Sequence, residues 1–408
     1  MTAPSRIVAI DVIRGLAVLG ILVMNIVSMG MPDYAYVDPH YYGGADGANL
    51  AAWMLAYVFA DGKMRALFSM LFGASLLIVT DAAEGRTPGP ARTHYPRMAW
   101  LLAFGMLHAW LVWYGDILVS YALCGTIAFA ARRWPPAALA YAATLLIGWS
   151  AAADLIRWHD MSVLRALATG PNPPADAVRE WGKVLDVVTP RPDVIAEQLR
   201  LYRGGFADVF AVRAAMTALL QFRLMPILLP ETLGLVALGM WLHRLDFWSG
   251  GWRRRHYAAM VATAGLALLC YAPLVAGILA RSFDPAFLPL AESVTTMLQP
   301  IVALGYAALL ILLMRAGRAR WWTVRLAAAG QMALTNYLGT SLIVTTLFYG
   351  YGLGLFGRLE RAELYWVVFG QWVLILAWSK PWLARFRYGP LEWLWRSLAR
   401  GRIQPMRR

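Results

Sequence analysis

The sequence predicts an all-α membrane protein, a bundle of about ten transmembrane helices with both termini in the cytoplasm. Of its 408 residues, 60% are hydrophobic and 15% are charged, whereas soluble globular proteins average about 45–50% apolar and about 25% charged residues. Apolar runs long enough to cross a bilayer recur along the whole chain. Arginine-rich and arginine-poor loops alternate between these runs, and this alternation indicates the orientation of the helices.

The first apolar run contains an acid and a base, Asp11 and Arg14. A signal peptide is a poor alternative for this run, because the two charges interrupt it and no small-residue cleavage site follows. Each predicted span has roughly the 20 apolar residues that a membrane helix needs. The spans cover residues 7–30, 51–80, 96–114, 117–131, 136–153, 224–243, 257–280, 290–314, 326–349 and 364–384.

The loops between the spans carry their arginines on alternate sides. Arginines cluster at residues 86–97, 132–133, 244–255, 315–325 and 385–408, whereas the loops at residues 30–49 and 114–116 contain no Lys or Arg. The positive-inside rule therefore places both termini in the cytoplasm. We divide the chain into a five-span bundle with the polar site (1–153), an external amphipathic segment (154–222), a second five-span bundle (223–385) and a cytoplasmic interfacial tail (386–408).

The formal net charge of +14 is a consequence of this topology. In a soluble protein such a charge would suggest nucleic acid, but the chain has no compact basic domain, so we expect no nucleic-acid partner. The two cysteines, Cys124 and Cys270, lie within apolar runs. They support neither a disulfide framework nor a metal site, and we expect both to be small buried residues.

Charged and polar side chains inside the spans are the strongest functional signal, because each costs a few kcal/mol or more unless it is paired or faces a polar cavity. On the first helix, Asn25 falls within about 40° of the face shared by Asp11 and Arg14. In the second span Asp61 and Arg65 form an i,i+4 pair, and Gly62 marks a possible break. The other such residues are Lys63, His108, Glu231 and Asn336.

His108 is the titratable group of greatest interest, because imidazole changes its charge near neutral pH. Asp116 follows it by eight residues, which on one continuous helix is about 12 Å of rise. We therefore expect the partner that orients His108 to come from another helix. Asp116 itself is expected to cap the start of the next helix.

Several segments together resemble a known family. They are "RIVAIDVIRGLAVLGILVMN", "DGKMRALFSMLFGASL", "LLAFGMLHAWLVWYGDILVSYALCG", "ETLGLVALGMWL", "GQMALTNYLGTSLIVTTLFYGYGLGLFG" and "YGPLEWLWRSL". These resemble the bacterial YeiB-like membrane proteins, a family of undefined function. The resemblance runs from Arg6 almost to the C-terminus. It implies a multi-pass protein of the bacterial cytoplasmic (inner) membrane.

The Asp-x-x-Arg-Gly opening and Asn25 also resemble the transmembrane acyltransferase superfamily, which includes the lysosomal heparan glucosaminide N-acetyltransferases. This resemblance is more distant and covers mainly the first two spans. It implies transfer of an acyl group from a cytoplasmic donor, acyl-CoA or similar, to a hydroxyl or amine of a glycan or lipid outside. No bound cofactor is expected. His40 lies in the following outer loop, but that loop differs in length from the enzyme's.

The residues suit this chemistry. A neutral His108 can take the proton of an acceptor hydroxyl, and Asn25, Arg65 or Lys63 can donate to the oxyanion, while Arg14 meets donor phosphates. The candidate catalytic residues are His108, Asn25, Asp61 and Arg65. The candidate substrate-binding residues are Asp11, Arg14, Lys63, Asp116, Glu231 and Asn336.

Two alternatives stay open at this point. Charged groups within the membrane, with Pro226 and Pro230 before Glu231, are also what a proton-coupled small-molecule transporter needs. The third possibility is a sensor or scaffold without turnover. In each case the lipid bilayer is a partner. The sequence does not predict which oligomeric state the protein adopts.

Overall fold

The computed structural model describes residues 7–317 and 320–408. Within them the named elements are all helices, joined by loops and by one isolated bridge between Phe386 and Arg407. The predicted all-α membrane class is confirmed, because seven helical runs among the described residues are long and apolar enough to cross a membrane. They are Val8–Gly30, Gly47–Asp81, Pro136–Ala168, Phe206–Arg244, Arg254–Ala280, Leu288–Arg315 and Arg361–Arg385. The count of ten spans and the cytoplasmic termini stay predictions.

The second predicted span is broken where the sequence suggested. Helix α1 covers Val8–Gly30, the short α2 covers Tyr34–Val37, α3 covers Gly47–Phe59 and α4 covers Lys63–Asp81. Between α3 and α4, Gly62 has a φ of +70°, and a Cβ there would lie 1.7 Å from the Gln299 side-chain oxygen. Only glycine fits both this conformation and this space.

The next two helices are joined by a loop that folds back between them. Helix α5 covers Gly89–Leu111, α6 covers Leu118–Ala128, and a 3₁₀ turn follows at Phe129–Arg133. The loop and the last turn of α5 are held by α10 (Phe206–Ala218). From α10, Arg213 donates to the Trp110 and Val112 carbonyls at 2.9 and 3.3 Å, and Thr217 donates to the Ala109 carbonyl at 3.0 Å. These carbonyl oxygens at the end of α5 thereby gain hydrogen-bond donors.

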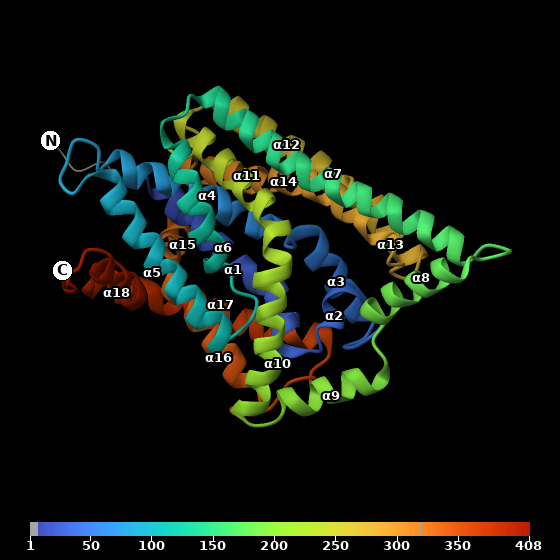
Figure 1. Ribbon diagram of the computed structural model, residues 1–408. Helices are drawn as coiled ribbons and strands as arrows, with labels where there is room; N and C mark the ends of the chain where they lie inside the picture. Colours follow the sequence, from blue (N-terminus) through green and yellow to red (C-terminus); the bar gives the residue numbers. More distant parts are fainter. Residues whose placement is uncertain (1–6, 318–319) are drawn as a thin grey trace.

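The central part of the chain contains the longest helix. Helix α7 runs over Pro136–Ala168, well beyond the predicted span 136–153, and α8 (Ala175–Val188) and α9 (Pro192–Tyr202) follow. Helix α10 then continues through a π-helical turn at Leu219–Leu224 into α11 (Met225–Arg244). Figure 1 shows α8 and α9 at the end of the molecule opposite the C-terminal helix α18 (Pro390–Ala399) and the loop between α4 and α5.

The C-terminal part completes the bundle. Helix α12 covers Arg254–Leu269, α13 Tyr271–Ala280, α14 Leu288–Arg315 and α17 Arg361–Arg385. The predicted span 326–349 is instead two helices, α15 (Arg320–Gln331) and α16 (Ala333–Phe348). The Asn336 amide bridges this break by donating to the Ala329 carbonyl at 3.0 Å and to Ser379 at 3.2 Å. Trp378 of α17 donates to its oxygen at 3.1 Å.

Glycines allow two pairs of helices to cross with their backbones in contact. Where α4 crosses α11, a Cβ on Gly73 would lie 2.0 Å from the Val236 carbonyl oxygen, and a Cβ on Gly239 would lie 1.8 Å from that of Met70. Where α1 crosses α15, Gly15 and Gly330 make the corresponding close approaches. Small residues at helix crossings are how membrane helices gain close van der Waals packing.

We predict that Gly239→Ala destabilises the protein, because the methyl group has to displace the backbone of α4 and overpacking costs about 1–3 kcal/mol. The control is Gly148→Ala on α7, where nothing lies within 4 Å of the added Cβ. That variant should be neutral or stabilised by up to about 1 kcal/mol. Thermal unfolding in detergent measures both, and equal stability of the two variants would contradict the crossing.

We also predict that Asp46 and Arg86 lie on opposite sides of the membrane. The test introduces a single cysteine at each position and labels intact cells with a membrane-impermeant maleimide. The background replaces the exposed free Cys270 by serine and keeps the buried Cys124. Labelling at Asp46 but not at Arg86 is the expected result, and equal labelling would contradict the predicted topology.

Candidate functional site

A cavity of about 850 Å³ lies among α1, α4, α5, α6, α16 and α18. Its mouth is at the arginine-rich end of the bundle, where Arg86, Arg387 and Arg396 are among the lining residues. Its inner part is lined by apolar and aromatic side chains, among them Phe68, Phe72, Leu118, Tyr121 and Tyr337. Such a cavity suits a ligand with an anionic head and an apolar body.

Asp11 and Arg14 line the wall of this cavity. The predicted pair is confirmed, because Arg14 Nη1 lies 3.3 Å from Asp11 Oδ1. Arg14 also donates to Ser75 Oγ at 2.8 Å. The first helix therefore carries its acid and base on a face that borders a hollow, where both groups avoid contact with lipid.

The inner end of the cavity is closed by Tyr121. Its ring stacks on Phe68 and Phe72 with centroid distances of 5.5 and 5.3 Å. Its hydroxyl lies 3.1 Å from Ser69 Oγ, and Ser69 in turn donates to the Arg65 carbonyl at 2.8 Å. Tyr121 thus separates the cavity from a second polar region, to which the Arg65 side chain belongs.

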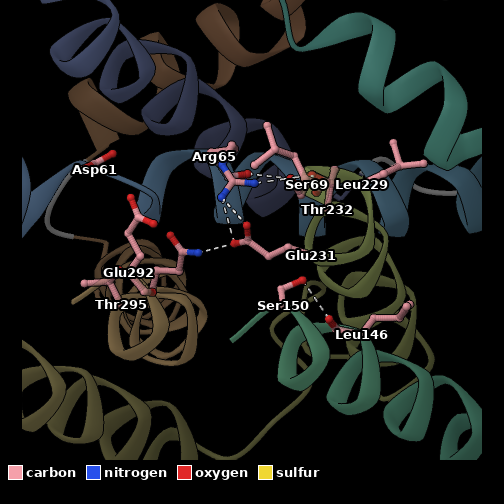
Figure 2. A network of polar contacts seen from close by, with 12 residues as sticks. Asp61, Arg65, Ser69, Leu146, Ser150, Leu229, Glu231, Thr232, Glu292 and Thr295 are labelled. Atoms are coloured by element: carbon pink, nitrogen blue, oxygen red, sulfur yellow. Dashed lines mark hydrogen bonds and ion pairs between the residues drawn. The ribbon is translucent and has the colours of Figure 1, made fainter. Parts of the chain in front are cut away.

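That second region is an ion-pair network between α4, α11 and α14, shown in Figure 2. Arg65 Nη2 donates to both Glu231 oxygens at 2.9 and 2.8 Å, and the Gln299 amide donates to Glu231 Oε1. Glu231 is 9% exposed at its side chain, but Arg65 is 34% exposed. The network therefore holds a buried carboxylate against the guanidinium of an arginine whose side chain is partly exposed.

The predicted pairing of Asp61 with Arg65 is wrong. The break at Gly62 places Asp61 outside α4, so the two side chains are not one helical turn apart. Asp61 Oδ1 instead accepts a hydrogen bond from the Tyr36 hydroxyl at 3.2 Å. Glu292 of α14 lies on the same side of the network as Asp61 (Figure 2).

Lys63 is held within the protein. Its ammonium donates to the Tyr57 carbonyl at 2.6 Å and lies 3.8 Å from the centre of the Tyr271 ring. The residue is 1% exposed. These two contacts attach the start of α4 to α3 and α13.

His108 is paired with Asp116, so the expectation that its partner comes from another helix is wrong. Helix α5 ends at Leu111, and the following loop folds back and brings Asp116 Oδ2 to 2.8 Å from His108 Nδ1. The other oxygen of Asp116 accepts the Val119 amide at 2.8 Å, which confirms its capping role on α6. Hydrogen bonding at Nδ1 leaves Nε2 as the ring's proton acceptor in the neutral form.

The His108 ring is buried behind the inner end of the cavity. The residue is 3% exposed, and its Nε2 has no hydrogen-bond partner within the described ranges. The Tyr337 ring, which lines the cavity, lies 5.3 Å from the imidazole between centroids. Trp113 covers a further side at 6.4 Å. Tyr337 is therefore the side chain between His108 and the cavity.

The structure does not gather all the candidate residues at one point. Asn25 is half-buried on α1, and no hydrogen bond joins it to His108 or Arg65 in the described part of the chain. Sequence analysis overlooked two other histidines in the cavity wall, His94 and His243. His94 is 2% exposed and bonds the Gly125 carbonyl through Nε2 at 2.9 Å. His94 lies seven residues before the apolar part of α5, so the sequence gave no indication that it would be buried.

The loop between α1 and α2 contains a buried carboxylate that the sequence did not single out. Asp33 accepts a hydrogen bond from the Tyr114 hydroxyl. Burial raises the pKa of Asp33 to about 6, although the Tyr114 hydrogen bond acts to lower it.

Of the two cysteines, Cys124 is buried as expected, but the expectation is wrong for Cys270, which is exposed. In the residues that the structure describes, no group of three or more His, Cys, Asp or Glu side chains is placed to hold a metal ion.

The fold and the charged residues within it define a multi-pass helical membrane protein with an internal amphipathic cavity. Residues 242–402 match the family described as "Protein of unknown function (DUF418)". The chain is 30% identical to the uncharacterized protein YeiB of Escherichia coli K12 over 96% of both chains. It is 28% identical to the uncharacterized protein YxaH of Bacillus subtilis 168, over 98% of this chain and 96% of the relative. The chain therefore belongs to the YeiB-like family, as its motifs indicated.

We predict that Glu231→Leu alone destabilises the protein more than Arg65→Met together with Glu231→Leu. The single change leaves a partly buried guanidinium without its carboxylate, at a cost of roughly 2–4 kcal/mol, whereas apolar replacement of both partners is often tolerated. Thermal unfolding of the single and double variants measures the difference. If the double variant were the less stable of the two, the unpaired guanidinium would not be the cause of the destabilisation and the prediction would be contradicted.

Proposed function

We propose that the protein is a transmembrane acyltransferase of the bacterial inner membrane. It takes an acyl group from an acyl-CoA-like donor in the cytoplasm and passes it to a hydroxyl or amine of a glycan or lipid. The observation that carries the proposal is the cavity, whose mouth is rich in arginine and whose inner part is apolar. An anionic head at the mouth and an acyl chain inside would match these two environments.

The inner end of the cavity provides the base for such a reaction. Asp116 holds Nδ1 of His108, so that Nε2 can accept the proton that an acceptor hydroxyl loses when it attacks the acyl carbonyl. The carbon–sulfur bond of the donor thioester then breaks, and the imidazolium returns the proton to the departing thiolate. The same carboxylate stabilises the imidazolium that forms, as in catalytic triads. A positioned base of this kind contributes typically about 10²–10⁴-fold in rate.

Access to His108 requires a movement of Tyr337. In the described conformation the Tyr337 hydroxyl accepts the Ile117 amide at 3.3 Å and lies 3.4 Å from the Gly115 carbonyl oxygen, two backbone contacts of the loop that carries Asp116. A rotation of this ring would connect the cavity to Nε2. Gated access of this kind excludes water until both substrates are present.

The acceptor is proposed to enter from the other side of Tyr121. There Arg65, whose side chain is partly exposed, lies beside Glu231 and Gln299. A guanidinium held by a carboxylate is a fixed hydrogen-bond donor, which suits a developing oxyanion or an acceptor oxygen. Tyr121 and Ser69 join the two regions by hydrogen bonds, so acyl transfer would occur close to this pair.

The test compares envelope glycans and lipids by mass spectrometry in cells that lack the protein and are complemented with variants. Wild type should restore an acylated species, His108→Ala should lose it, and Asp116→Asn should reduce it by at least about tenfold, because the ring loses its fixed tautomer. His40→Ala is the matched control, since His40 also pairs with an aspartate, Asp38, at 2.7 Å but lies exposed in the outer loop.

Two results would contradict the proposal. Restoration by His108→Ala at the wild-type level would remove His108 from the reaction. Loss in His40→Ala with activity retained in His108→Ala would move the base to the outer loop. Because His108→Ala leaves the buried Asp116 carboxylate without its partner, the amount of folded protein in the membrane is measured for each variant and the product is compared per folded protein.

A proton-coupled transporter is the second candidate, and the Arg65–Glu231–Gln299 network favours it. The network lies beside the helix break at Gly62, and broken helices with buried charges form the substrate sites of many carriers. Uptake or efflux of an unmodified solute by proteoliposomes, abolished by Glu231→Gln and independent of His108, would support a carrier. Covalent labelling of an acceptor from acyl-CoA would support the enzyme.

A further inference from the structure

Arg97 of α5 is fixed at the mouth of the cavity by the C-terminal helix. Its guanidinium lies 4.4 Å from the centre of the Trp395 ring on α18, and the Trp395 indole donates to the backbone carbonyl of Arg97 at 2.9 Å. The two residues therefore hold one another at a defined place in the cavity wall. A guanidinium stacked on an aromatic ring keeps its N–H groups free in the plane of the fork.

Positive charge accumulates around Arg97. No carboxylate lies within ion-pair distance of it among the residues described, and the charges that act on it are those of Arg396 and Arg400. Arg387 and Arg396 line the same cavity. Like charges held close together in a partly buried place are unfavourable unless an anion joins them.

The carboxylates of the cavity wall do not pair with Arg97, because each is engaged elsewhere. Asp11 pairs with Arg14, Asp81 with Arg244 at 2.9 Å, and Glu84 with Arg133. Glu392 accepts the Thr335 amide at 3.0 Å and the Thr335 hydroxyl at 2.6 Å, which anchors α18 to the start of α16. Burial raises the pKa of Glu392, while its hydrogen bonds to Thr335 act to lower it.

We propose that Arg97, Arg387 and Arg396 form a binding site for a phosphate or pyrophosphate group, on a ligand whose apolar part extends into the cavity. Guanidinium forks bind phosphate oxygens in pairs, which gives both charge and geometry. The apolar lining by Phe68 and Phe72 begins on the inner side of this site. The ligand is therefore a phosphate-bearing amphipath.

Two sources share this chemistry, a soluble acyl thioester with a phosphorylated head and an anionic phospholipid of the inner leaflet. The inference rests on the proposed function only for the choice between them. The arginine site itself depends on the cavity and its charges. It would bind the same phosphate chemistry in a protein that transfers no acyl group.

The experiment measures binding without turnover. Full-length protein in phosphatidylcholine nanodiscs is titrated with coenzyme A, with inorganic pyrophosphate, and, in separate preparations, with phosphatidylglycerol in the nanodisc. The signals are the melting temperature and tryptophan fluorescence, since Trp395 touches Arg97. We expect a rise in melting temperature and a saturable fluorescence change with coenzyme A, with pyrophosphate competing for the same site.

Arg97→Gln should weaken this binding by about tenfold or more, because charge-assisted hydrogen bonds are lost. Arg92→Gln is the matched control, since Arg92 is an exposed arginine on the same helix that does not line the cavity. It should bind as wild type does. Without ligand, Arg97→Gln loses the contact with the Trp395 ring but also relieves repulsion among the arginines. Its melting temperature should therefore lie close to that of wild type.

The outcomes separate this site from the acyl-transfer reaction. A response to coenzyme A alone assigns the soluble source, and a response to phosphatidylglycerol alone assigns the lipid source; both support the site. No response to any of the three probes, or equal binding by Arg97→Gln and Arg92→Gln, would overturn it. Binding that depends on Arg97 in a protein without acyl transfer would keep the site and remove the proposed reaction.

Discussion

The architecture depends on two close helix crossings that glycine makes possible. Gly73 and Gly239 bring α4 against α11, and Gly15 and Gly330 bring α1 against α15. Helix α11 supplies Glu231 and α4 supplies Arg65, so the first crossing sets the distance across which this ion pair forms. The second sets the position of Asp11 and Arg14 on the cavity wall. Lipid offers no hydrophobic drive for helix association, so packing of this kind has to provide it.

Charge is distributed in layers along the bundle. Arginines gather at the mouth of the cavity, an aromatic layer with Tyr121 and Tyr337 closes its inner end, and the Arg65–Glu231–Gln299 network lies beyond. The Arg65–Glu231–Gln299 layer pairs its charges locally, as a low-dielectric surrounding requires. A ligand that enters from one end therefore meets charge first and apolar surface second, whereas a ligand from the other end meets the ion pair directly.

The helical class and most helix positions could be predicted from sequence, because apolar length and arginine distribution act locally along the chain. The break at Gly62 and the pairing of Asp11 with Arg14 followed in the same way. The partner of His108 did not, since the end of α5 at Leu111 depends on contacts from α10 that lie a hundred residues away in the chain. Arg97 also escaped notice, because only its contact with Trp395 distinguishes it from the neighbouring arginines of an ordinary cytoplasmic loop.

The role of α18 as a wall has a consequence for biogenesis. Trp395 and Arg396 line the cavity together with residues of α1, α4 and α5, yet α18 leaves the ribosome after every other helix of the wall. Before α18 docks, the nascent bundle therefore has a half-open groove where the cavity will form. A ligand of the proposed arginine site could be held only after Glu392 docks on Thr335. Docking of α18 would then both complete the fold and make the cavity able to bind the proposed ligand.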